Sequence, residues 1–224
     1  VVLDEIDREA MQGERVARPV VASPAEEGRA SVVMVSAGPA IPNVEVKVAD
    51  EHGEALPDRV IGELALRSDS MLSGYYHRED ATHKAIKHGW YFTGDYGYKV
   101  GAEVFVAGRK KDMIIVGGKN VYPMDLEELA MEVPGVHPGR VVAFGIFNEE
   151  AGTEDVVIVA EVETQEQAEL ERIADGVRAV VTRGSAIALR HVHLVGPKWL
   201  IKTSSGKTAR GANKEKYMRE SKGF

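Results

Sequence analysis

The sequence predicts an α+β chain in two parts, an antiparallel β-subdomain over residues 1–108 and a small α+β domain over residues 109–224. Two observations support this prediction. Short apolar and β-branched runs, separated by Gly, Pro and Asp turns, fill the first part. The second part alternates apolar runs with one long amphipathic segment. A Gly-Arg-Lys-Lys-Asp run at 108–112 marks the join, where we expect a hinge.

The first part opens with an acidic stretch, residues 1–12, for which we expect a short helix. A loop is expected at 19–28, where Pro and Gly interrupt any regular pattern. Turn residues then separate short runs of strand formers, which favours antiparallel neighbours. The expected strands are 31–36, 44–48, 62–67 and a hairpin-rich stretch at 90–106.

The second part carries clearer periodicity. A Gly117-Gly118 pair between two short apolar runs is a hairpin signal. Pro123 favours the start of a helix over 124–132, which Pro134-Gly135 ends. Residues 165–183 place apolar side chains at i, i+3, i+4 and i+7, which predicts an amphipathic helix. The other expected elements are strands at 141–147, 156–162 and 188–195, a Gly/Ser/Thr loop and a basic terminal helix.

Composition excludes several classes of protein. The 224 residues contain no Cys, which excludes disulfide scaffolds, Cys-ligated zinc and a thioester carried on this chain. A reducing compartment follows as the simplest expectation, so we expect a cytoplasmic protein. No apolar run approaches the roughly 18 residues of a membrane span. The chain starts at Val1 without a Met, as expected of a piece of a longer polypeptide.

The charge is unevenly distributed. The net charge is −7, yet residues 198–224 contain eight basic and two acidic side chains. A basic tail on an acidic body is typical of a solvated end or of an arm that binds nucleic acid. Aromatic residues are not interleaved with these lysines, so stacking on bases is poorly supported and no nucleic acid is expected. An anionic small molecule remains compatible with this charge.

Residues 202–210, KTSSGKTAR, are the most informative segment. Small and hydroxylated residues around a lysine let the backbone approach a ligand and offer N–H and O–H donors to an anion such as phosphate. Gly206-Lys207-Thr208 copies the end of a P-loop, but the first glycine of that motif would fall at Ile201, so we reject a P-loop. The alternative is a flexible loop before the tail helix.

Two further segments offer polar groups for a nucleotide. In 91–95, YFTGD, a carboxylate on a Thr-Gly turn suits paired hydroxyls such as a ribose diol, although a plain Asx-type turn is the alternative. In 108–112, a basic residue could reach a nucleotide while its neighbour absorbs a backbone rotation. The alternative for that segment is a solvated linker.

Other titratable residues are less informative. His191 and His193 share one face of an expected strand, a spacing seen in metal sites, but the nearby sequence supplies no third ligand, and we predict no metal site here. Glu127-Glu128 and Glu149-Glu150 are expected to lie on solvated faces.

In order and spacing, these segments resemble the C-terminal third of the adenylate-forming ligase superfamily. That superfamily includes acyl-CoA synthetases, fatty acyl-AMP ligases and the adenylation domains of peptide synthetases. Stretches such as 120–127 and 138–144 are similar to the fatty acyl-AMP ligases and to the acyl-CoA ligases related to them. The segments that carry the resemblance are 62–66 with 73–76, 91–95, 108–118 and 202–210.

The resemblance implies roles for the nucleotide-side residues. Asp95 would accept hydrogen bonds from the ribose hydroxyls of ATP, and Arg109 would support the same ribose. Lys207 would bridge the carboxylate substrate and the α-phosphate. A fixed cation at that point stabilises the charge that develops when two anions meet.

The resemblance also implies a rotation of the small domain between two half-reactions. Lys111 falls where the family has its hinge residue. Gly117 and Gly118 would face the thiol acceptor after the rotation and let a pantetheine arm pass close to the backbone. The expected acceptor is an acyl carrier protein, and the expected acyl donor is a fatty or related carboxylic acid.

The family's phosphate-binding loop and its Mg²⁺-supporting Glu do not occur in this sequence and are expected upstream of it, so the chain alone is expected to be inactive. ATP and Mg²⁺ are the cofactors implied for the intact ligase. One alternative is an acyl-CoA synthetase, which uses CoA as the acceptor. Another is a non-catalytic module that binds a carrier protein or a partner subunit.

Overall fold

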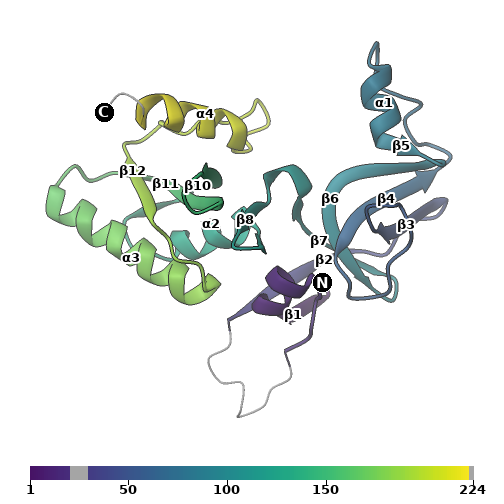
Figure 1. Ribbon diagram of the computed structural model, residues 1–224, viewed down its shortest axis with the longest axis horizontal. Coiled ribbons are helices and arrows are strands. Elements are labelled where there is room, and N and C mark those ends of the chain that lie inside the picture. The colour runs from purple at the N-terminus through teal and green to yellow at the C-terminus, as the bar shows by residue number, and fades with distance from the viewer. Residues whose placement is uncertain (21–29, 222–224) are drawn as a thin grey trace. The chain divides into compact units, whose positions relative to one another are not determined.

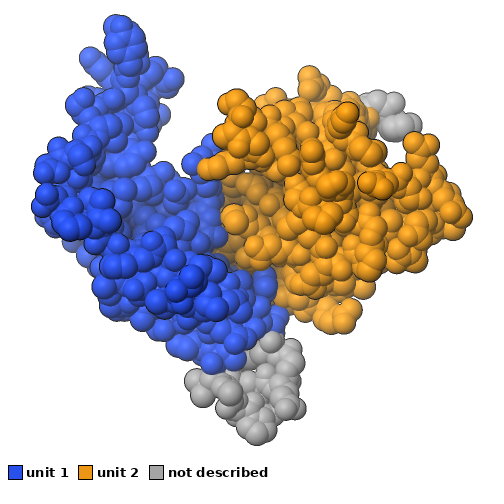
Figure 2. Space-filling view, turned by 180° about the vertical axis from the view of Figure 1, so that it is seen from behind, with its two compact units in different colours: residues 1–111 blue, residues 112–224 orange. Residues whose placement is uncertain are grey.

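The computed structural model describes residues 1–20 and 30–221. Most of the segment for which we expect a loop, 19–28, therefore lies outside the described residues. The chain divides into two compact units, Val1–Lys111 and Asp112–Phe224, which Figure 2 colours blue and orange. This division falls inside the 108–112 segment. Each unit is described by itself.

Unit 1 is built on an antiparallel sheet in the order β1-β2-β7-β6-β4-β3, with β5 paired to β6 (Figure 1). The antiparallel β-structure expected for this part is confirmed. Its strands are β1 (Leu3–Asp7), β2 (Ser31–Gly38), β3 (Val44–Ala49), β4 (Gly62–Ser68), β5 (Ile86–Lys87), β6 (Trp90–Val100) and β7 (Glu103–Arg109).

The prediction of a helix over residues 1–12 is wrong. Leu3–Asp7 forms β1, and a short π-helix, η1 (Ala10–Glu14), follows it. β1 pairs antiparallel with β2, where Ile6 faces Val32 in the register. Ile6 is fully buried in this arrangement. Pairing with a strand distant in sequence therefore outweighs the local helix preference of an acidic segment.

Side-chain contacts inside unit 1 connect the edge strand β1 to the central strands β6 and β7. The ring of Tyr98 on β6 stacks on Phe105 of β7 at a centroid distance of 4.8 Å. The Tyr98 hydroxyl donates to Asp4 on β1 at 2.8 Å, and Arg59 pairs with the same carboxylate at 3.1 Å. The structure also has a helix that we did not predict, α1 (Glu79–Ala85). None of its residues is buried, so its sequence lacks the apolar periodicity from which a helix is predicted.

Unit 2 begins with a two-stranded hairpin and continues as a mixed sheet. The three-stranded sheet has the order β10-β11-β12, antiparallel between β10 and β11 and parallel between β11 and β12. The expected α+β fold is confirmed. Its elements are β8 (Ile114–Val116), β9 (Lys119–Val121), α2 (Pro123–Met131), β10 (Val136–Asn148), β11 (Thr153–Val162), α3 (Gln167–Ser185), β12 (His191–Val195) and α4 (Arg210–Ser221).

The sheet of unit 2 is covered on both faces (Figure 1). Ile158 and Ala160 of β11 belong to the core that includes residues of α2 and α3. Val157 and Val159 alternate with them and belong to a second core, against which Tyr217 of α4 packs. Because successive side chains of a strand point to opposite faces, a strand buried on both faces is apolar along its whole length. Among the described residues, no helix is both long enough and apolar enough to cross a membrane.

Candidate functional site

The YFTGD segment lies in β6 and turns sharply at its glycine. Gly94 has a φ of 75°, which favours glycine. The Thr93 hydroxyl accepts the Asp95 N–H at 3.0 Å and donates to the Leu64 carbonyl at 2.9 Å. Thr93 therefore holds this turn, whereas a plain Asx turn would use the carboxylate. The Asp95 side chain stays available for another partner.

That partner is Arg109. The register of β6 and β7 places Asp95 directly opposite Arg109, and the Arg109 Nε lies 3.3 Å from the Asp95 Oδ1. The Arg109 side chain is 61% exposed and that of Asp95 is 31% exposed. The backbone thus brings the two predicted ribose contacts together at a half-open surface, where both remain accessible to a ligand.

Two polar pairs surround this carboxylate and guanidinium. Lys110 donates to Glu63 at 2.8 Å, and this hydrogen bond raises the pKa of Lys110. The hydroxyls of Tyr75 and Tyr91 lie 3.2 Å apart. That hydrogen bond, followed by partial burial and nearby charge, raises the pKa of Tyr91. Tyr91 is therefore a neutral hydrogen-bonding group at physiological pH.

Lys207 lies near the tip of a closed, exposed loop that precedes α4. Lys202 and Thr208 form a β-bridge across this loop. The Thr203 N–H donates to the Lys207 carbonyl at 2.8 Å, and the Lys207 N–H donates to the Thr203 hydroxyl at 3.2 Å. Gly206 takes a φ of 81° at the turn. No described residue pairs with the Lys207 ammonium, so the loop presents a free cation beside hydroxyl groups.

Arg210, the first residue of α4, ties the base of this loop to the interior of unit 2. Its guanidinium donates to Asp112 at 2.8 Å, to Glu127 at 2.7 Å and to the Ala143 carbonyl at 2.9 Å. The expectation that Glu127 lies on a solvated face is wrong, because its side chain is 14% exposed and also accepts the Ala143 N–H. Burial raises the pKa of Glu127, although Arg210 opposes this shift.

The Gly117-Gly118 pair forms the two-residue turn of the β8–β9 hairpin. Val116 pairs with Lys119, and the two glycines take φ values of 56° and 82°. Positive φ at both central positions is typical of a type I′ turn. A Cβ at either glycine would meet nothing within 4 Å, so backbone strain, not crowding, is what calls for glycine here.

The predicted site residues fall in different parts of the chain. Asp95 and Arg109 lie side by side in unit 1, whereas Lys207 and the glycine turn belong to unit 2. Lys111 is the last residue of unit 1 and lies in a single 3-10 turn, Lys110–Asp112. The roles assigned to all of these residues stay predictions.

Residues 1–20 and 30–221 contain no group of three or more His, Asp or Glu side chains that could hold a metal ion. The His193 ring packs edge-on against Trp199 and Tyr217, and burial lowers its pKa. His191 faces Asp155 at 3.8 Å.

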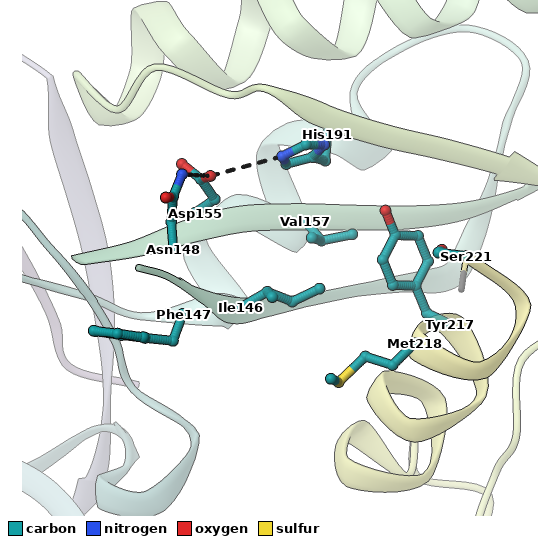
Figure 3. A pocket seen from close by; sticks show the side chains of 9 residues that line it. All are labelled: Ile146, Phe147, Asn148, Asp155, Val157, His191, Tyr217, Met218 and Ser221. Carbon is teal, nitrogen blue, oxygen red and sulfur yellow. Dashed lines mark hydrogen bonds and ion pairs between the residues drawn. The ribbon is translucent and has the colours of Figure 1, made fainter. Parts of the chain in front are cut away.

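Beside His191, unit 2 has a half-open pocket of about 320 Å³ (Figure 3). Its floor is apolar and its polar rim includes Asp155, to which Asn148 donates at 2.7 Å. None of the predicted site residues lines it. Its lining residues are Ile146, Phe147, Asn148, Asp155, Val157, His191, Tyr217, Met218 and Ser221.

Several residues that organise the site were missed at the sequence level. Glu63 and Arg210 belong to segments that the sequence singles out, but their roles were not predicted, and Asn213 was not singled out. Each of the three bonds to a partner at least 12 residues away, which local spacing does not reveal. One signal existed for Asn213. It is a weak helix former inside a helix, which suggests a specific hydrogen-bonding role.

Comparisons with known proteins agree with this architecture. The family model described as AMP-binding enzyme matches residues 17–76. A putative acyl-CoA synthetase of Caulobacter vibrioides is 32% identical over 94% of this chain and 37% of its own length. JamA of Moorena producens, a medium-chain fatty acid ligase that uses acyl carrier protein, is also 32% identical over the same shares. A solved structure from a study of fatty acyl-adenylate ligases of E. coli and L. pneumophila is 27% identical, with a TM-score of 0.85, over 100% of this chain and 39% of that one.

Residues 17–76 thus match the AMP-binding enzymes, and nearly the whole chain is similar to an acyl-CoA synthetase and to a fatty acyl-adenylate ligase structure. The chain belongs to the adenylate-forming ligase superfamily, and its relatives include fatty acyl ligases and acyl-CoA synthetases. The chain spans less than two fifths of the length of these relatives.

Proposed function

We propose that this chain is part of an ATP-dependent ligase that activates a fatty or related carboxylic acid as an acyl-adenylate and then passes the acyl group to a phosphopantetheine thiol. The observation that carries the proposal is the Lys207 loop, which holds an unpaired cation beside hydroxyl groups. Membership of the superfamily supports the same chemistry.

In the first half-reaction, Lys207 neutralises the two anions that must approach each other, the substrate carboxylate and the α-phosphate. A carboxylate oxygen forms a bond to the α-phosphorus, the bond to the β-phosphate oxygen breaks, and pyrophosphate leaves. Asp95 accepts hydrogen bonds from the ribose hydroxyls, and Arg109, already paired with Asp95, orients that carboxylate. Electrostatic stabilisation of this kind contributes about 3 kcal/mol per donor in comparable sites.

In the second half-reaction, a thiol sulfur attacks the acyl carbonyl, the thiol proton is lost to solvent and AMP leaves. The Gly117-Gly118 turn forms part of the acceptor's path, because its open backbone can contact a pantetheine arm closely. Lys111 is the hinge at which unit 2 rotates between the two half-reactions.

The acceptor is proposed to be an acyl carrier protein, on the similarity to JamA. Free CoA is the second candidate, because the putative acyl-CoA synthetase is as similar. Supplying purified enzyme with CoA or with carrier protein, and measuring which is acylated, distinguishes the two.

The test of the adenylation role is Lys207→Ala in the enzyme that contains this chain. Pyrophosphate exchange is expected to fall by at least about 100-fold, the effect of losing one such electrostatic group. Transfer from supplied acyl-adenylate to the thiol is expected to stay within about threefold, since Lys207 acts before that step. Equal loss in both assays would contradict the role proposed for Lys207.

A further inference from the structure

Asn213 is a polar side chain that unit 2 buries completely. It lies in the first turns of α4, with no exposed surface, while most of its neighbours on this helix are exposed or half-buried. A buried amide costs free energy unless its donors and acceptors are satisfied, so its partners indicate what it does.

Those partners are the two ends of the Lys207 loop. The Asn213 Oδ1 accepts the Ile201 N–H at 2.8 Å. Its Nδ2 donates to the Ile201 carbonyl and to the Ala209 carbonyl, each at 2.9 Å. The Ala209 N–H also donates to the Ile201 carbonyl, at 3.0 Å. One side chain therefore closes the mouth of the loop formed by residues 202–208.

Leu200, the residue before this closure, is held by a hydrogen bond to a side chain of the sheet. Glu161 of β11 is buried, and its Oε1 accepts the Leu200 N–H at 2.7 Å. The loop thus leaves a fixed point at Leu200 and returns to a fixed point at Ala209. Between these points, residues 202–207 are exposed and bond mainly to one another. Their path therefore depends on the closure at the base.

From this geometry we infer that Asn213 is a positioning residue for Lys207. By holding Ile201 and Ala209 together, the Asn213 amide fixes the position of the Lys207 backbone and thereby limits the positions that the Lys207 ammonium can take. The inference rests on the role proposed for Lys207. A displacement of about 1 Å at a reacting group can cost about 100-fold in rate, so a loosened base impairs chemistry without unfolding the domain.

The test is Asn213→Asp in the enzyme that contains this chain. The two side chains have nearly the same shape, but a carboxylate oxygen would face the Ile201 and Ala209 carbonyls where an N–H now donates. Adenylation kcat, measured by pyrophosphate exchange, is expected to fall at least about tenfold, with the KM values for ATP and acid within about twofold. Transfer from supplied acyl-adenylate is expected to be unchanged.

A pH profile of the ratio of adenylation to transfer adds a readout that a general loss of stability, which lowers both activities together, does not produce. The carboxyl group that Asn213→Asp introduces carries an O–H when it is protonated, and this O–H can donate again to a carbonyl. A buried carboxyl facing carbonyls also protonates more easily than usual. The adenylation defect of Asn213→Asp is therefore expected to shrink as the pH is lowered toward 5, relative to the parent enzyme. A defect that is constant with pH would overturn the inference.

The matched control is Asn148→Asp. Asn148 is a half-buried asparagine of unit 2 that bonds to Asp155 and to the Glu150 and Ala151 N–H groups, not to the loop. This variant is expected to lower stability while leaving the ratio of adenylation to transfer unchanged. The same altered ratio in both variants would overturn the inference.

The outcomes separate this inference from the proposed function. If Lys207→Ala abolishes adenylation and Asn213→Asp leaves it intact, only the role of Asn213 is wrong. If Lys207→Ala retains adenylation, the proposed function itself fails. Should Asn213→Asp not fold, Asn213→Ser, which keeps a hydroxyl in a smaller volume, is measured in its place and is expected to give a smaller loss of the same kind.

Discussion

The Asp95–Arg109 pair of unit 1 and the Lys207 loop of unit 2 are held in place by different means. Asp95 and Arg109 face each other through the backbone pairing of β6 and β7, whose register shifts just beyond Tyr96, and their own contact is partly exposed. The Lys207 loop has few contacts of its own and depends on two side chains at its base, the partly buried Arg210 and the fully buried Asn213.

This difference predicts where each site is sensitive to mutation. A pair placed by strand register tolerates a side-chain change, because the backbone ladder that positions it remains. A loop placed by a few buried polar groups does not, since removing one leaves its partners without a hydrogen bond. Side-chain substitutions at the base of the loop should therefore affect stability far more than substitutions in the exposed pair.

The largest effect is expected for Arg210→Ala. It leaves the Asp112 and Glu127 carboxylates together without a cation in a mostly buried position. Loss of one partner from such a cluster costs about 3 kcal/mol. Urea unfolding measures this, with Arg178→Ala as the control, since the exposed Arg178–Asp175 pair should contribute less than about 0.5 kcal/mol. Similar losses of unfolding free energy in Arg210→Ala and Arg178→Ala would contradict the proposed difference between buried and exposed ion pairs.

A smaller, pH-dependent effect is expected for Glu127→Gln. Burial raises the pKa of Glu127 above 4.5 in the folded state, so this carboxyl's contribution to stability is fully present below pH 4.5 and is lost as the pH rises through the folded pKa. The free energy of unfolding of the parent, minus that of the variant, should therefore decrease as the pH is raised from 4.5. Denaturant titrations at several pH values measure this difference, and an increase with pH would contradict the shift.

About 1 kcal/mol of destabilisation is expected for Gly118→Ala, because an L side chain is strained at a φ of 82°. Gly118→Asn should lose less, since Asn tolerates the left-handed region. Gly211→Ala is the control, because Gly211 lies in α4 with open space around it and ordinary φ, so Ala should be neutral or stabilising there. Thermal unfolding of the three variants measures these differences, and Gly118→Ala is expected to be the least stable of them.

The smallest effect on stability is expected for Asp95→Asn. Its exposed pairing with Arg109 should contribute about 0.5 kcal/mol, within the range of surface pairs. The KM for ATP in the intact enzyme should nevertheless rise about tenfold, because hydrogen bonds to a charged group stabilise by about 1.5 kcal/mol or more. A stability loss as large as that of Arg210→Ala would show that this pair, too, supports the fold.

The fold was predictable where the pattern is local. The i, i+3, i+4 spacing of Ile173 and Val177 predicted α3, and the paired glycines predicted the β8–β9 hairpin. Residues 3–7 were misassigned because their partner, β2, lies more than 20 residues away and only the pairing shows which side of Ile6 is buried.

The candidate site divides in the same way. Lys207, Asp95 and Arg109 belong to short motifs whose residue types are informative by themselves. Glu127 is not, because an isolated Glu in a helix has the same sequence signature whether it faces solvent or a buried partner, and Asn213 offers only the weak signal of a poor helix former inside a helix. What distinguishes them is a contact with residues 12 to 83 positions away, which only the folded chain provides.

The Arg210–Asp112 contact also has a mechanical consequence. Asp112 is the first residue of unit 2, and Arg210 follows the Lys207 loop directly, so one guanidinium links the domain's entry point to the base of its lysine loop across 98 positions of sequence. In the rotation proposed for unit 2, this contact would make the Lys207 loop move together with the first residue of the unit.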